Sequence, residues 1–88
     1  MTDDPIADRV QAIVARIAGP GRTPPDASPD TPLGAEGFWL DSLDLLDVIV
    51  ACESEFGTVL DQASGLGVEA LESARNLARV ISTQLDTR

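Results

Sequence analysis

The sequence predicts an all-α fold: a small four-helix bundle of three main helices and a short third helix, with a long first loop. Three segments carry apolar residues at helical spacing, and none has the pattern of a strand. Prolines and glycines gather between the first two segments, where they exclude regular structure. Because 88 residues with 43% apolar composition suit one compact core, we expect a single domain over residues 1–88.

The first helix is expected over about residues 4–18. Asp4 is a suitable N-cap, Pro5 suits the first helical position, and Gly19 ends the pattern. The apolar residues recur at helical spacing, so they share one face: Ile6, Val10, Ile13, Val14 and Ile17.

Residues 19–41 are expected to form a loop, because this segment holds five prolines and four glycines. A loop this long in so small a domain indicates either a function or disorder. Its last part regains large apolar side chains, so we expect that part to pack: Leu33, Phe38, Trp39 and Leu40.

The second long helix is expected over about residues 42–56, with Gly57 at its end. Asp41 is a suitable N-cap whose carboxylate can accept from the Asp44 amide, which places Ser42 at the first helical position. One apolar stripe of this helix is predicted to face the core: Leu45, Val48, Ile49, Cys52 and Phe56. In that stripe Cys52 is expected to be a small buried hydrophobe rather than a reactive thiol.

A second apolar stripe on the same helix has no evident place in a domain with one core. It consists of Leu43, Leu46 and Val50, and it is bordered by Asp44, Asp47, Glu53 and Ser54. Either this stripe packs under the long loop, or it is an exposed strip with an acidic rim, which is the usual anatomy of a partner-docking surface.

Two further elements are expected after this helix. Residues 61–70 contain Gly65 and Gly67 and are expected to hold a short or irregular helix. Ser73 is the expected N-cap of a last helix over about residues 74–85, whose apolar residues again recur at helical spacing.

Acidic residues dominate the middle of the chain. The net charge is −9, and between Thr23 and Ala74 there are eleven acids and no basic residue. One interpretation is that the middle of the chain forms a negatively charged surface that repels nucleic acid and anionic membranes and attracts basic proteins. The other is that this acidic surface only keeps the protein soluble. No apolar run is long enough for a membrane span, the N-terminus is acidic, and the single cysteine cannot form an internal disulfide, so we expect a cytoplasmic protein. We also expect it to be a monomer.

Ser42 is the candidate functional residue, although the chain cannot activate it. No histidine or lysine is present to act as a general base, and no cluster of cysteine and histidine suggests a metal site, so we expect neither a catalytic residue nor a metal. The unpaired amides at a helix start would stabilise a phosphate ester on Ser42, which Asp41, Asp44 and Asp47 would partly oppose. Ser42 is therefore either an ordinary helix-start serine or a site that another protein modifies.

The segment Asp41-Ser42-Leu43-Asp44, preceded by Thr31-Pro32-Leu33-Gly34 and followed by Glu53-Ser54-Glu55-Phe56-Gly57, resembles the acyl carrier protein family. The resemblance covers nearly the whole chain and implies a four-helix bundle. It also implies that Ser42, flanked by Asp41 and Leu43, receives the 4'-phosphopantetheine of coenzyme A from a phosphopantetheinyl transferase with Mg²⁺. The chain would then be a phosphoprotein and a substrate of enzymes rather than an enzyme, and the arm would carry acyl groups as thioesters.

Partners and pathway are implied by the same resemblance. A ketosynthase, an acyltransferase or ligase, and other enzymes with basic patches would dock on the acid-rimmed strip: Leu43, Asp44, Leu46, Asp47, Val50 and Glu53. Fatty acid carriers usually read Gly-Ala-Asp-Ser-Leu, whereas the form GxxLDSLD here is similar to the discrete carriers of bacterial type II polyketide and aryl-polyene-like pathways. Polyketide, antibiotic or fatty acid biosynthesis is the expected setting.

Phe38 and Trp39 set this chain apart from the usual carrier pattern, and at least one of their rings should lie near Ser42. We favour a ring that plugs the loop onto the helical core. The alternative is a partly exposed Trp39 that shields the thioester or contacts an acyl group or an enzyme.

Two other functions remain open on the residues alone. One is a non-enzymatic acidic helical adaptor or regulatory protein that binds a basic partner. The other is a hydrolase or transferase that uses Ser42, which the lack of a general base disfavours.

Overall fold

The computed structural model describes residues 4–61 and 66–86. It contains α1 (Pro5–Ala18), α2 (Ser42–Phe56), the short 3-10 helix η2 (Glu69–Leu71) and α3 (Ala74–Asp86). The described residues form no strand, so the predicted all-α fold is confirmed. The short helix expected within residues 61–70 is reduced to the single turn of η2, and residues 62–65 lie outside the described part.

The helices begin and end where local signals favour it. The Asp4 carboxylate accepts from the Ala7 amide at 3.1 Å, and the Ser73 hydroxyl accepts from the Asn76 amide at 3.2 Å, as expected of N-caps. Gly57 follows α2 with φ of 65°, a left-handed conformation that favours glycine.

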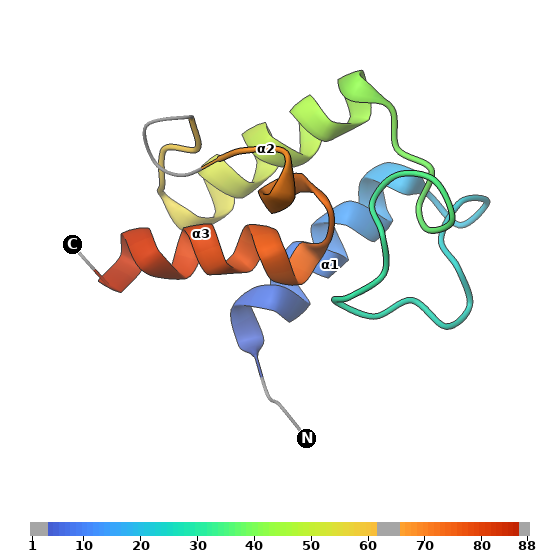
Figure 1. Ribbon diagram of the computed structural model, residues 1–88, viewed down its shortest axis with the longest axis horizontal. Helices are drawn as coiled ribbons and strands as arrows, with labels where there is room; N and C mark the ends of the chain where they lie inside the picture. The colour runs from blue at the N-terminus through green and yellow to red at the C-terminus, as the bar shows by residue number, and fades with distance from the viewer. Residues whose placement is uncertain (1–3, 62–65, 87–88) are drawn as a thin grey trace.

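A single core lies between the helices and the end of the long loop. α1 packs against both α2 and α3, and α3 also contacts η2 (Figure 1). The largest fully buried side chains of the core come from all three helices and from the loop: Val10, Val14, Leu33, Phe38, Val48, Cys52, Leu77 and Ile81. The core stripe predicted for α2 is confirmed, since Val48, Cys52 and Phe56 are buried while Leu45 and Ile49 pack against the core.

The long loop follows a defined path because the start of α3 holds it. The Leu33 amide donates to the Glu72 carbonyl at 3.0 Å, and the Arg75 amide donates to the Pro29 carbonyl at 2.9 Å. The Arg75 guanidinium also donates to both carboxylate oxygens of Asp30, at 2.6 and 3.2 Å. The loop is thereby joined between Pro29 and Leu33 to Arg75 of α3 and to Glu72, which lies just before α3.

The expectation of a one-sign middle surface is only partly right. Three ion pairs among the described residues join an acid between Thr23 and Ala74, where the sequence has no basic residue, to an arginine from outside that stretch. They are Arg9–Glu55, Arg22–Asp44 and Arg75–Asp30. Folding brings these arginines beside the loop and α2, which the linear order of charges does not reveal. None of the helices in the described ranges is long and apolar enough to cross a membrane.

Candidate functional site

Ser42 is the first residue of α2, and a reciprocal pair of hydrogen bonds fixes the turn that holds it. The Asp44 amide donates to the Asp41 carboxylate at 2.9 Å, and the Asp41 amide donates to the Asp44 carboxylate at 3.2 Å. The Leu45 amide then donates to the Asp41 carbonyl at 3.0 Å, which starts the helical pattern. The predicted cap is confirmed, and this capping box spans Ser42.

The Ser42 side chain is exposed, and within residues 4–61 and 66–86 nothing bonds to its hydroxyl. The amides of Ser42 and Leu43 are likewise without an acceptor in those residues, as expected for the first turn of a helix. The sequence contains no histidine or lysine that could take the hydroxyl proton. Ser42 is therefore accessible to another protein, and no side chain of the described residues is bonded to its hydroxyl.

The loop that leads into Ser42 is folded back on itself by backbone hydrogen bonds. The Phe38 amide donates to the Pro32 carbonyl at 3.0 Å, the Trp39 amide to the Gly34 carbonyl at 2.9 Å, and the Leu40 amide to the Leu33 carbonyl at 2.9 Å. A Cβ at Gly37 would lie 1.8 Å from the Pro32 carbonyl oxygen, so this close approach requires glycine. The segment forms a compact turn directly before Ser42.

The two aromatic residues of this turn have opposite surroundings. Phe38 is fully buried, so the favoured prediction of a ring that plugs the loop onto the core is confirmed for Phe38. Trp39 is 61% exposed and has φ of 57°, a left-handed backbone conformation that is uncommon for a bulky residue. Trp39 therefore has the exposure that the alternative interpretation required, two residues before the capping residue of α2.

The second apolar stripe of α2 is open to solvent. Leu43 is 72% exposed, Leu46 56% and Val50 62%. The alternative in which these residues pack under the long loop is wrong, because the loop buries Leu33, Phe38 and Leu40 on the core instead. An exposed apolar strip on one helix is typical of a surface that contacts a partner.

The acidic residues beside this strip differ in whether their carboxylates already have hydrogen-bond partners within the fold. Asp44 Oδ2 accepts from Arg22 Nη1 at 2.8 Å, and this bond, with a smaller contribution from the Asp41 amide, lowers the pKa of Asp44 below its ordinary value. Glu53 accepts from the Leu60 amide at 2.9 Å beyond the end of α2. Asp47 is exposed, and its carboxylate has no partner in the part of the chain that the structure describes.

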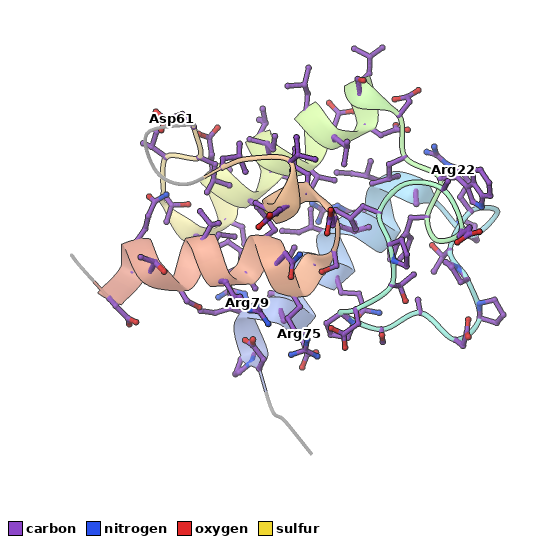
Figure 2. The ribbon with its side chains drawn as sticks, viewed as in Figure 1. Arg22, Asp61, Arg75 and Arg79 are labelled. Atoms are coloured by element: carbon purple, nitrogen blue, oxygen red, sulfur yellow. The ribbon has the colours of Figure 1, made fainter. Side chains whose placement is uncertain are left out.

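Arg22 is the residue of this site that the sequence did not single out. Its guanidinium lies beside the start of α2 although Arg22 lies 20 positions before Ser42 in the chain (Figure 2). The only signal was its position as the one basic residue of a long acidic and proline-rich loop. Its position in the sequence does not indicate which acidic residue forms the ion pair with Arg22.

Two other candidate features do not include Ser42. Cys52 is buried in the core, where burial and, to a lesser extent, the charge of Glu55 raise the pKa of its thiol to about 11. An open groove is lined by Leu45, Val68, Leu71 and residues of the loop and α3, and it includes none of the predicted site residues. The described residues contain no cluster of side chains that could hold a metal ion.

Comparison with known families gives a match over most of this chain. A family model described as "Phosphopantetheine attachment site" matches residues 8–82. Comparisons with curated proteins and with solved structures give no match. The matched region contains Ser42, the exposed strip and all three ion pairs.

Proposed function

The chain belongs to the phosphopantetheine attachment family, and from this premise we propose that it is an acyl carrier protein whose attachment residue is Ser42. A domain of this family is the site of covalent attachment of 4'-phosphopantetheine. The observation that supports Ser42 is its place at the start of α2, exposed and without a hydrogen-bond partner in the described ranges. The whole chain would then form a single carrier domain.

The residues around Ser42 fit a phosphodiester. The free amides of Ser42 and Leu43 and the positive end of the α2 dipole stabilise a negative charge at this point. Asp41 and Asp47 oppose it in part, whereas the charge of Asp44 is paired with Arg22. When it is attached, the arm supplies a terminal thiol that holds an acyl group as a thioester.

In this proposal the chain is the substrate of a phosphopantetheinyl transferase rather than a catalyst. The Ser42 oxygen forms the new bond to phosphorus, and the adenosine bisphosphate portion of coenzyme A leaves with the electrons of the broken pyrophosphate bond. The hydroxyl proton passes to a base of the transferase, because this chain has no histidine or lysine to accept it.

The exposed strip of α2 is the proposed docking surface for the transferase and for pathway enzymes such as a ketosynthase and an acyltransferase or ligase. Leu43, Leu46 and Val50 supply apolar contact area, and Asp47 supplies a free negative charge for basic patches on the partners. The proposed cargo is a polyketide or fatty acyl intermediate.

The test is intact-mass measurement after incubation with coenzyme A, Mg²⁺ and a broad-specificity phosphopantetheinyl transferase. We expect the mass of one arm to be added to the wild type and nothing to be added to Ser42→Ala. The variant should keep its helicity, because an exposed side chain contributes little packing. An unmodified wild type would favour the acidic adaptor, and an arm on Ser42→Ala would exclude Ser42 as the attachment residue.

A further inference from the structure

Arg22 connects three parts of the fold through one guanidinium. Nε donates to the Ala18 carbonyl at 3.0 Å and Nη2 to the Ile17 carbonyl at 3.4 Å, both at the end of α1. Nη1 donates to the Trp39 carbonyl at 3.4 Å in the loop and to the Asp44 carboxylate at 2.8 Å in α2. The planar group thus holds the end of α1 against the loop and the first turn of α2.

The two contacts of Nη1 lie on either side of Ser42. Trp39 precedes the serine by three residues, and Asp44 follows it by two. The Asp44 oxygen that accepts from Arg22 is the same oxygen that accepts from the Asp41 amide. Arg22 therefore restrains the capping box itself, and with it the direction in which the first turn of α2 presents its side chains.

We propose that Arg22 is a positioning residue for the modification of Ser42. Through Asp44 and the Trp39 carbonyl it holds the turn around Ser42 in the conformation that the transferase requires. This inference rests on the proposed function, in which Ser42 receives the arm.

The surroundings of Asp44 and Asp47 separate this positioning role from docking. The Asp44 side chain is 19% exposed and is bonded to Arg22, whereas Asp47 is exposed and free of partners among the described residues. A free charge affects how often a partner binds and is screened by salt. A restraint on the serine instead affects the rate once the complex has formed.

The experiment compares Arg22→Gln and Arg22→Lys with wild type in steady-state loading by a phosphopantetheinyl transferase with coenzyme A and Mg²⁺. We expect Arg22→Gln to lower kcat by about tenfold or more, with little change in the KM for the carrier. Arg22→Lys should recover only part of the rate, because a single ammonium group cannot span the oxygens of Ala18, Trp39 and Asp44 together.

A second measurement needs no transferase. Trp39 is the single tryptophan and its carbonyl accepts from Arg22, so its emission in the unmodified protein reports on the turn. We expect Arg22→Gln and Asp44→Asn to shift this emission in the same direction. Their combination should add little to either change if both act through one contact.

Arg75→Gln is the matched control, because it also removes an arginine whose hydrogen bonds join the loop to a helix, here from α3 to Asp30 of the loop. Figure 2 shows Arg75 at the start of α3, well apart from Arg22. We expect this variant to lose stability while kcat and the emission of Trp39 stay at wild-type values.

Four results would overturn the positioning role of Arg22. The first is a wild-type kcat in Arg22→Gln, and the second is an effect of that variant on KM alone. The third is an equal loss of kcat in Arg75→Gln. The fourth is loss of the fold in both Arg22 variants, because Arg22 would then be purely structural. A wild type that accepts no arm at Ser42 would instead remove the proposed function itself. The two failures are therefore distinguishable.

Discussion

At the scale of single residues, Phe38 and Trp39 show how two adjacent aromatic side chains can differ in their effect on stability. Replacing buried Phe38 by alanine leaves a cavity in the core, so we expect the free energy of unfolding to fall by about 3–5 kcal/mol. Replacing exposed Trp39 by alanine should change it by less than about 1 kcal/mol. Urea unfolding followed by circular dichroism measures both.

Fluorescence then tests whether Trp39 senses the cargo. The apo form, the arm-bearing form and the acylated form would be compared by the emission of this one tryptophan. A cargo-dependent shift, together with the small stability change, would support contact between Trp39 and the acyl group or its arm. Identical emission in all three forms would restrict Trp39 to contacts with partner enzymes or to none.

At the scale of elements, the turn before α2 depends on one glycine. In Gly37→Ala the new Cβ would meet the Pro32 carbonyl, so we expect a loss of about 1–3 kcal/mol in the free energy of unfolding. Gly34→Ala is the matched control in the same loop, because nothing lies within 4 Å of the added Cβ. Equal stability of the two variants would contradict the close approach of Gly37 and Pro32.

The docking role of α2 is tested at its unpaired acid. In Asp47→Lys we expect the KM of the transferase for this chain to rise about two- to tenfold. Added salt should reduce the difference in KM between the variant and the wild type. Asp26→Lys makes the same change of charge in the long loop and should leave KM near its wild-type value. A KM that is equal in both variants and independent of salt would remove the electrostatic part of the docking proposal.

The elements that could be predicted from the sequence are those with local causes. Caps such as Asp4, Asp41 and Ser73 act within three residues, and the stripes of α2 follow from helical spacing alone. The path of the loop and the place of Arg22 depend on approaches between distant segments, as in the Arg22–Asp44 and Arg75–Asp30 pairs. The exposure of Trp39 could not be predicted either, because the choice between it and Phe38 depends on the turn at Gly37.

At the scale of the whole molecule, the ion pairs predict how stability depends on pH. Hydrogen bonds from Arg75 and Arg22 hold the pKa values of Asp30 and Asp44 below their ordinary range. The unfolded chain therefore binds protons at these groups at higher pH than the folded chain does. Their stabilisation is complete above the ordinary carboxyl pKa of about 3.9 and is lost as pH falls through the lowered values.

We therefore expect the free energy of unfolding of the wild type to decline below about pH 4 and to decline less in Asp30→Asn. Urea unfolding over a series of pH values measures this dependence. Asp26→Asn is the control, since Asp26 is an exposed acid of the same loop that forms no ion pair with the described residues. The same decline in Asp30→Asn as in wild type would show that the Arg75 pair does not contribute.

The burial of Cys52 has a consequence for the lifetime of the cargo. Burial, with a smaller contribution from the charge of Glu55, raises the pKa of this thiol to about 11, and the core covers the side chain. We therefore expect the Cys52 thiol neither to capture an acyl group from the arm nor to join two carriers through a disulfide under oxidising conditions. In the proposed function an acyl group on the arm is therefore not lost to Cys52, so the order in which partner enzymes dock on the carrier would determine where its cargo goes.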